Sequence, residues 1–205
     1  MSDADTIVRT GRKFDQVIAG AREVFMADGY EGASVDDIAR AAGVSKATLY
    51  SYFPDKKLLF MEVATHECRR MIEETSVRID RSAPVAEVLT LTAVQIVTFT
   101  TSGFGVQMFR ISVAEAERFP ELGRAFYESG PVQGRQRLAE YFQDACDAGD
   151  LAMDDLLLAA EQFSDLCRAG LWSRAVLGLQ TEFSTEEIAH VAQEAVATFL
   201  ARYGA

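Results

Sequence analysis

Apolar residues recur along much of the chain at the spacing that places them on one face of an α-helix. From Lys13 to Gly29 they fall three and four residues apart, as on a single helical face. Further long helices are predicted at residues 58–79, 120–148, 154–177 and 184–202. The strand and turn signals of an all-β chain are few. The pattern therefore predicts an all-α fold of about nine helices.

Residues 32–60 predict two short helices joined by a tight turn and followed by a third helix. Ser34 suits the N-cap of the first helix, and Asp37 three residues later completes a pair of the capping-box kind. Gly43 suits the left-handed residue just beyond that helix. Ser45 then caps the second helix. The segment is therefore predicted to form a helix-turn-helix.

The second of these helices has an apolar face and a polar face. Leu49 and Phe53 lie four residues apart and face inward. The opposite face offers a lysine, small residues, hydroxyls and a tyrosine, which suit a nucleic-acid groove. We predict that six residues enter the major groove of a double-stranded DNA operator: Ser45, Lys46, Ala47, Thr48, Tyr50 and Ser51.

The third helix begins with two lysines. Asp55 can cap it, and Lys56 and Lys57 then occupy its first turn, where cations oppose the helix macrodipole and repel each other. A bound phosphate would satisfy both the lysines and the free N–H groups of that helix end. An isolated pair of this kind is mostly just solvated. Beside a helix-turn-helix, we predict instead that Lys56 contacts a DNA phosphate, as Ser34 does through its own helix end.

The region from about Lys13 to Phe60 resembles, without a gap, the N-terminal DNA-binding domain of the TetR family of bacterial transcriptional regulators. The resemblance implies a DNA-binding domain over residues 1–57 and a ligand-binding and dimerisation domain over residues 58–205. It also implies that Tyr50 and Tyr52 hold the DNA backbone. The matching residues are Phe25, Gly29, Tyr30, Ile38, Ala39, Ala42, Gly43, Val44, Ser45, Leu49, Tyr50, Tyr52, Phe53, Lys56 and Leu58.

Two positions depart from that family pattern, and a second, shorter match lies further along the chain. Ala47 stands where the family often has glycine, and Lys57 where it often has glutamate. The stretch from Glu115 to Tyr127 is similar to the C-terminal domain of one branch of the family, often associated with efflux or stress regulation.

The segment from Val88 to Phe109 contains no charged residue. Its length invites a membrane-spanning interpretation, but its many hydroxyl and amide side chains favour a helix buried inside a bundle. We expect an apolar cavity here for a small, neutral, lipophilic effector, although plain core packing would explain each aromatic residue singly. The predicted lining residues are Phe99, Phe104, Met108, Phe109, Phe126, Tyr127 and Trp172.

The last two predicted helices, at residues 154–177 and 184–202, have wide apolar faces with small residues among them. Such faces permit close packing against a second copy of the chain, or they close the chain's own core. Because helix-turn-helix proteins commonly read two half-sites as dimers, we predict a homodimer on a palindromic operator. The predicted interface residues are Leu166, Gly170, Ala192, Ala195, Val196 and Phe199.

The net charge of −11 argues against a protein that binds nucleic acid over its whole surface. Residues 1–57 are nearly balanced, with eight basic and nine acidic side chains, whereas residues 58–205 hold twelve and twenty-two. Basic residues of the first part can gather on one surface: Arg9, Arg12, Lys13, Lys46, Lys56 and Lys57.

Little in the chain suggests catalysis, a metal or a cofactor. There are two histidines, no glycine-rich phosphate loop, and three widely spaced cysteines, Cys68, Cys146 and Cys167. The cysteines suit a reducing cytosol, as buried thiols or as redox sensors. We therefore expect a cytoplasmic, nucleoid-associated repressor that is not an enzyme and needs no cofactor. A DNA-binding regulator without an effector, or an activator, remains the alternative.

Overall fold

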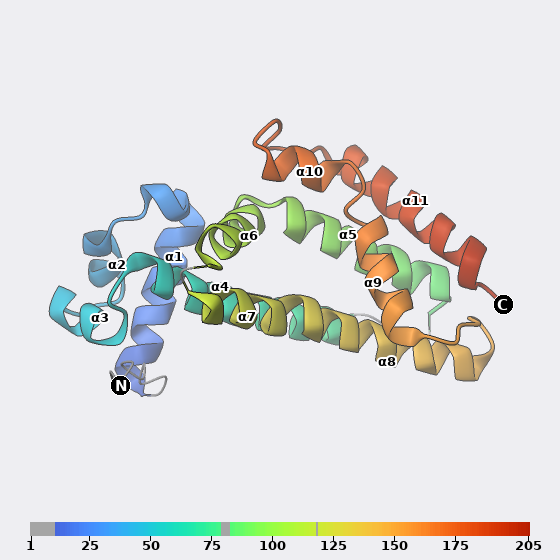
Figure 1. Cartoon of the computed structure of the whole chain (residues 1–205), viewed down its shortest axis with the longest axis horizontal. Helices are drawn as coiled ribbons and strands as arrows, with labels where there is room; N and C mark the ends of the chain where they lie inside the picture. Colours follow the sequence, from blue (N-terminus) through green and yellow to red (C-terminus); the bar gives the residue numbers. More distant parts are fainter. Residues whose placement is uncertain (1–10, 79–82, 118) are drawn as a thin grey trace. The chain divides into compact units, whose positions relative to one another are not determined.

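The computed structural model describes residues 11–78, 83–117 and 119–205. In these ranges the chain forms eleven α-helices and one π-helical turn and contains no β-strand, which confirms the all-α prediction (Figure 1). Arg9, which was counted with the basic surface, lies outside the described residues.

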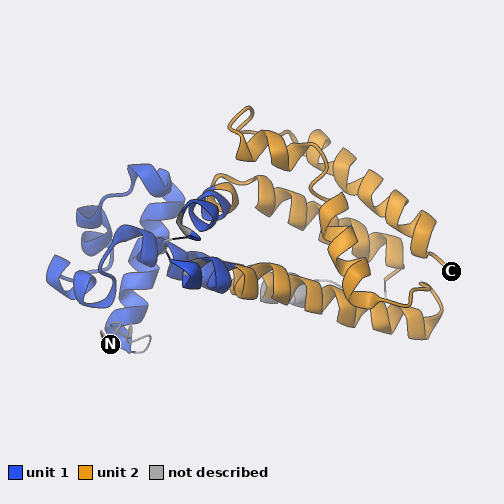
Figure 2. Ribbon diagram, in the orientation of Figure 1, with its two compact units in different colours: residues 1–67, 107–126 blue, residues 68–106, 127–205 orange. Residues whose placement is uncertain are grey.

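The chain divides into two compact units (Figure 2). Unit 1 comprises residues 1–67 and 107–126, and unit 2 comprises residues 68–106 and 127–205. Residues 107–126 thus cluster with the N-terminal helices, although they are distant from them in sequence. Compactness does not assign a role, so the functional division at residue 57 stays a prediction.

Unit 1 contains the predicted helix-turn-helix. Its first helix is interrupted at Gly29, which has a left-handed backbone with φ of 69°, at the position where the sequence predicts the helix to end. The unit consists of α1 (Arg12–Gly32), α2 (Val35–Ala41), α3 (Lys46–Tyr52), the first half of α4 (Lys56–Arg78), most of α6 (Gly103–Glu115) and all but the last residue of α7 (Pro120–Tyr127).

Aromatic side chains and one close backbone approach hold unit 1 together. Phe25 and Phe60 are buried with ring centroids 5.0 Å apart in an edge-to-face arrangement, a favoured geometry for aromatic pairs. On α1, a Cβ atom at Gly20 would lie 2.4 Å from the backbone nitrogen of Ala42. Only glycine therefore lets α1 and the end of α2 approach this closely.

The described residues of unit 2 surround an apolar core. Its α5 packs on α11 and α10, and its α8 packs on α9. Phe142, Phe163 and Phe199 meet in this core, and the ring centroid of Phe199 lies 5.1 Å from each of the other two. The helices of the unit are the end of α4, α5 (Val85–Thr101), η1 (Glu128–Val132), α8 (Gln133–Ala148), α9 (Leu156–Leu166), α10 (Leu171–Val176) and α11 (Thr185–Tyr203).

Two predicted helices are divided in the structure. The uncharged run breaks at Ser102, whose extended backbone ends α5 and whose Oγ accepts a 3.0 Å hydrogen bond from the N–H of Gly105. The helix predicted over 154–177 ends before Gly170, which has a left-handed backbone with φ of 72°. Its N-cap is Asp155, whose carboxylate accepts the Leu158 N–H at 2.9 Å.

The helix starts predicted near residues 184 and 120 are confirmed. Ser184 and Glu187 form a reciprocal capping box at the start of α11, and their hydrogen bond lowers the pKa of the Glu187 carboxyl. Pro120 is the first residue of α7. The helix predicted over residues 120–148 passes through the π-helical turn η1, which contains Pro131.

Among the described helices, none is by itself long and apolar enough to cross a membrane. Only α5 and α6 taken together pass such a test, and they are separate helices that meet at Ser102.

Four of the six residues predicted for the dimer interface are buried within a single chain. Ala192, Ala195, Val196 and Phe199 are each at most 5% exposed and belong to the core of unit 2 in a single chain. The apolar stripe of α11 is therefore used within the protomer, which is the alternative that the sequence left open. A rigid association of two chains cannot bury these side chains a second time.

Candidate nucleic-acid interface

The start of α2 is fixed by Ser34. Its Oγ accepts the Asp37 N–H at 3.1 Å, as an N-cap should. The Ser34 hydroxyl also donates to the Asp37 carboxylate, so this carboxylate does not reach back to the backbone as in a full capping box. That hydrogen bond, with a further one from Arg40, lowers the pKa of the Asp37 carboxyl.

The turn between α2 and α3 has the predicted chemistry. Gly43 adopts the left-handed conformation with φ of 63°, which glycine enters without steric cost. Ser45 then caps α3, since its Oγ accepts the Thr48 N–H at 3.1 Å. These local bonds set where α3 begins and which of its faces is turned outward.

The two faces of α3 are as predicted. Leu49 is 1% exposed and packs inward, whereas Tyr50 is 48% exposed. Tyr52 is half-buried, and its ring meets that of Phe14 edge-to-face at 6.0 Å. Thr48 is also half-buried. The remaining predicted readout residues are exposed: Ser45, Lys46, Ala47 and Ser51.

Lys46 has a partner that the sequence analysis did not identify. Its ammonium group lies 2.6 Å from the carboxylate of Asp36 on α2, and both side chains are more than half exposed. The hydrogen bond to Asp36 raises the pKa of Lys46, so the amine stays protonated. An exposed pair of this kind contributes little to stability. The ammonium can therefore exchange its carboxylate for a phosphate or a base edge at small cost.

Lys56 joins α4 to the end of α1. Its Nζ donates to the carbonyl oxygens of Tyr30 at 2.8 Å and Ala33 at 3.0 Å, and lies 4.5 Å from the centroid of the Tyr30 ring. Asp55 caps α4 as predicted, accepting the Leu58 N–H at 2.8 Å. Two of the three ammonium donors are thus engaged inside unit 1, which leaves one for a phosphate.

The predicted effector residues are spread over both units. Met108, Phe109 and Phe126 belong to unit 1, where the rings of the two phenylalanines lie 6.4 Å apart edge-to-face. The other four predicted lining residues belong to unit 2: Phe99, Phe104, Tyr127 and Trp172. The cavity that they were expected to form therefore stays a prediction.

Thiols and metal-binding groups do not form a second centre among the described residues. No group of three or more histidine, cysteine or acidic side chains is arranged to hold a metal ion there. Cys68 and Cys167 are buried, and burial raises the pKa of the Cys167 thiol to about 12, so it stays protonated and unreactive.

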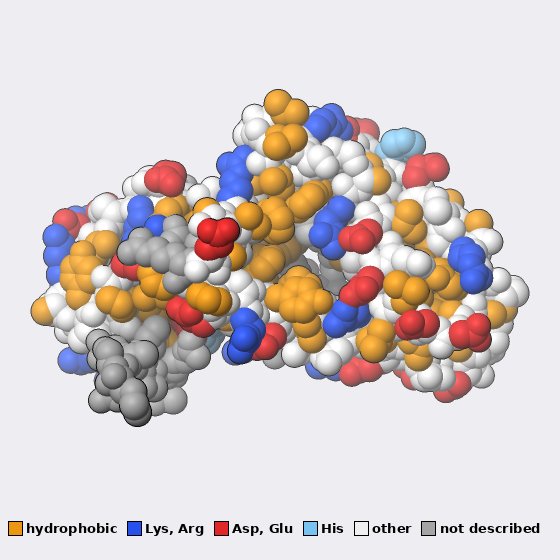
Figure 3. Space-filling model, viewed as in Figure 1, with side chains coloured by type: hydrophobic (Ala, Val, Ile, Leu, Met, Phe, Trp, Pro, Cys, Tyr) orange, Lys and Arg blue, Asp and Glu red, His pale blue; other side chains and the backbone are white. Residues whose placement is uncertain are grey.

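The surface charge agrees with a localised DNA contact. On the face drawn in Figure 3, acidic and basic side chains are interspersed over unit 2. This mixture, with the net charge of −11, disfavours binding of nucleic acid over the whole surface. The exposed face of α3 is thus the best candidate for a nucleic-acid contact.

The chain is similar in sequence and fold to known transcriptional regulators. Residues 87–205 match the C-terminal domain of AefR-like transcriptional repressors, and residues 17–63 match the bacterial regulatory proteins of the tetR family. A solved TetR-family regulator from Mesorhizobium loti is 30% identical, with 95% of this chain and 98% of that chain covered and a TM-score of 0.79. The flavonoid-responsive regulator FrrA is 38% identical, with the same coverage and a TM-score of 0.67.

A curated relative matches over a shorter region. The transcriptional repressor AcnR of Corynebacterium efficiens is 38% identical over 61 residues, which cover 30% of this chain and 32% of AcnR. The chain thus spans about a third of the length of that relative. Taken together, the helix-turn-helix, the outward face of α3 and the match over residues 87–205 assign the chain to the TetR family of bacterial transcriptional regulators, as a non-enzymatic, DNA-binding protein with an AefR-like C-terminal domain.

Proposed function

We propose that the protein is a homodimeric repressor that binds a palindromic operator and leaves it when a small lipophilic effector binds. The observation that carries the DNA-binding part is the outward face of α3, which combines an exposed lysine and tyrosine with small side chains and hydroxyls. Such a face fits the major groove and offers donors to base edges. The protein would act in the cytoplasm, at the nucleoid.

Within this proposal, the predicted DNA-binding residues divide into two groups. Ser45, Lys46, Ala47, Thr48, Tyr50 and Ser51 enter the groove. Tyr52, Ser34 and Lys56 hold the sugar-phosphate backbone, as Tyr50 does in addition to entering the groove. Lys56 uses its third ammonium donor for this contact. Contacts to phosphate set the position of a protein on the duplex, whereas contacts to base edges provide specificity.

Replacing Tyr50 by alanine tests the assignment of α3. The operator is first obtained by selection from a random duplex library, and affinity is then measured by fluorescence anisotropy at fixed salt. We expect Tyr50→Ala to weaken operator binding by about a hundredfold or more, because one lost base contact costs about 1–3 kcal/mol and a dimer loses two.

The matched control is Met26→Ala, in the same unit and with a similarly exposed side chain (52% against 48% for Tyr50). Both variants should melt at the wild-type temperature, and Met26→Ala should bind DNA normally. Undiminished affinity in the Tyr50 variant would refute the placement of α3 in the groove.

For the homodimer we propose the outer face of α11 together with the turn that precedes it. Gln193, Ala197 and Ala201 are exposed at intervals of four residues on α11, so they form one stripe of mostly small side chains. Leu177 and Leu179 in the turn are 72% and 74% exposed. Large apolar side chains exposed to this degree are typical of an interaction surface when they occur together.

A charge in this stripe should separate the protomers. We expect Ala197→Glu to convert the dimer to a monomer in light scattering, because a buried, unpaired carboxylate costs several kcal/mol on each side of a two-fold axis. Ala19→Glu, at an exposed position of α1, is the control and should remain dimeric. A wild-type protein that is monomeric at micromolar concentration would overturn the homodimer itself.

The effector proposal rests on the polar groups of α5. The Gln95 Oε1 atom is buried and has no hydrogen-bond partner among the described residues. The hydroxyls of Thr92 and Thr100 donate to carbonyls one turn earlier, at 2.8 and 2.7 Å, so only their lone pairs remain available. This helix therefore presents acceptors, and an effector that satisfies them carries hydroxyl or N–H donors. A phenolic molecule has such donors. The name of the relative FrrA, a flavonoid-responsive regulator, agrees with this class of effector.

Naringenin, a hydroxylated flavonoid, and flavone, which lacks hydroxyls, separate donor recognition from apolar binding. We expect naringenin to bind about three- to tenfold more tightly than flavone, the worth of one neutral hydrogen bond, and to displace operator DNA. Gln95→Leu should abolish this difference in calorimetry, whereas Gln136→Leu, at an exposed position of α8, should preserve it. Equal binding of both compounds by the wild type would contradict the proposed role of Gln95.

A further inference from the structure

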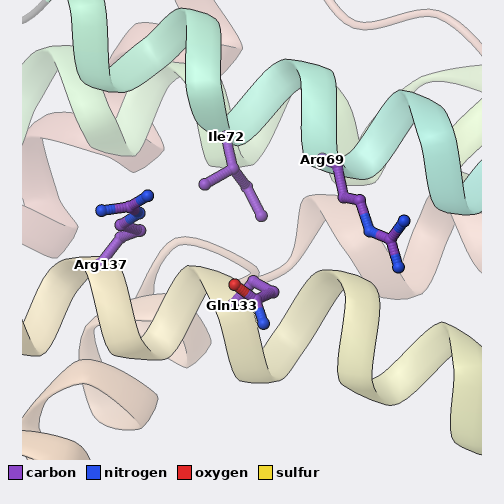
Figure 4. A pocket seen from close by; sticks show the side chains of 4 residues that line it. All are labelled: Arg69, Ile72, Gln133 and Arg137. Carbon is purple, nitrogen blue, oxygen red and sulfur yellow. The ribbon is translucent and has the colours of Figure 1, made fainter.

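A small groove lies in unit 2 between the second half of α4 and the start of α8. It has a volume of about 170 Å³ and is lined by Arg69 and Ile72 from α4 and by Gln133 and Arg137 from α8. Figure 4 shows the two helices side by side, with these side chains entering the space between them from both. The spacings of three and four residues place each pair on one face of its helix.

One of the two arginines of this groove, Arg69, lacks among the described residues the ion pair that other arginines of unit 2 form. Arg135, Arg168 and Arg174 each pair with a carboxylate. Arg69, by contrast, has no hydrogen bond or ion pair with any residue that the structure describes. Arg137 pairs with Glu140 on its own helix, at 3.1 Å, and both of these side chains are about half exposed. Arg69 thus lines the groove without a carboxylate partner among the described residues, whereas the exposed pair of Arg137 contributes little and is easily exchanged.

The donors in the groove match one class of ligand. A guanidinium group has five N–H donors in a planar fork and no acceptor, which suits the oxygens of a carboxylate or a phosphate. The amide of Gln133 adds two further N–H donors, while Ile72 offers apolar contact. Sites for drug-sized ligands have volumes of about 300–1,000 Å³. This groove therefore suits a small anion or the anionic head of a longer molecule.

We infer that the groove between α4 and α8 is a binding site for an oxyanion, a carboxylate or a phosphate, held by Arg69 and Arg137 with Gln133 as a further donor. The ligand gives Arg69 an anionic partner and connects α4 to α8. Because α4 begins in unit 1 directly after the helix-turn-helix, the anion is an input to the regulator in addition to the lipophilic effector. This regulatory consequence rests on the proposed function, whereas the binding itself does not.

Titration calorimetry of the full chain with inorganic phosphate and with benzoate, at constant ionic strength and without DNA, tests the binding. We expect saturable binding near the millimolar range, since each hydrogen bond to a charged group contributes about one to two orders of magnitude. The double variant Arg69→Gln, Arg137→Gln should bind at least about tenfold more weakly. The control Arg202→Gln removes an exposed arginine of α11 and should bind as the wild type does.

The two anions distinguish the possible sources of the ligand. Tighter binding of benzoate identifies an organic carboxylate that uses Ile72, and tighter binding of phosphate identifies a phosphate group. Equal affinity in the wild type and the double variant, or no saturable binding of either anion, overturns the inference. The anion titration contains no DNA, so it tests the anion site alone. Operator binding, measured separately by anisotropy, tests the proposed regulator, and either can fail without the other.

Discussion

Gly20→Ala is expected to destabilise unit 1 strongly and to remove DNA binding with it. The new Cβ would lie 2.4 Å from the backbone nitrogen, 2.6 Å from the Cα and 2.7 Å from the Cβ of Ala42. These atoms belong to the end of α2, so they cannot swing aside as a flexible side chain would. Overpacking costs about 1–3 kcal/mol and sometimes more, so the melting temperature should fall by about 2–12 °C.

Gly134→Ala provides a matched control within the same chain. Gly134 lies in α8, and a Cβ atom there would meet nothing within 4 Å. Alanine is a better helix former than glycine by about 0.5–1 kcal/mol, so this variant should melt at or slightly above the wild-type temperature. Circular dichroism and calorimetry measure both variants. If Gly20→Ala melted like Gly134→Ala, the close contact of α1 and α2 would be wrong.

Phe199→Ala is expected to have the largest effect on unit 2. The Phe199 side chain is 1% exposed, and its ring centroid lies within 5.1 Å of those of Phe142 and Phe163 and 4.8 Å from that of Tyr203. Truncating a buried phenylalanine removes its apolar contacts and leaves a cavity, at a cost of about 3–5 kcal/mol. The melting temperature should therefore fall by about 6–20 °C.

This variant also separates a core position from an interface position. The folded fraction of Phe199→Ala should have the wild-type mass in light scattering, because the side chain faces the protomer's own core. Leu179→Ala removes a large apolar side chain that is 74% exposed. It should change the free energy of unfolding of the protomer by no more than about 0.5 kcal/mol. A folded, monomeric Phe199 variant would restore this residue to the interface.

The sequence alone determined the elements that short-range hydrogen bonds define. Ser34, Ser45 and Ser184 each cap a helix through an N–H three residues further on, and Gly43 takes the left-handed conformation just after α2. Such bonds close within one turn, so the residue types at that spacing are sufficient to predict them. The inward face of α3 was predictable in the same way, because Leu49 and Phe53 are apolar and four residues apart.

Breaks inside apolar runs were less visible in the sequence. Ser102 interrupts a run that reads as one continuous helix, because its hydroxyl also caps the following helix. Gly170 ends another with a left-handed backbone. In both places hydrophobic periodicity continues across the break, since both helices bury a face. Periodicity reports burial, and burial persists where the backbone path changes.

Only the tertiary structure decided which partner each side chain meets. The apolar stripe of α11 that holds Phe199 was visible in sequence, but only packing against α5 and α9 showed that it closes the chain's own core. Gly20 meets Ala42, and the ammonium of Lys56 reaches the carbonyls of Tyr30 and Ala33, across twenty or more residues.

The groove between α4 and α8 shows most clearly that contacts between distant residues could not be predicted from the sequence. Arg69 and Arg137 are ordinary surface arginines when each helix is considered alone, and nothing near either in sequence points to the other. Their side chains line one groove because two helices distant in the chain lie side by side. Helical period determines the face on which a residue lies, whereas the contact between faces depends on long-range packing that local sequence does not encode.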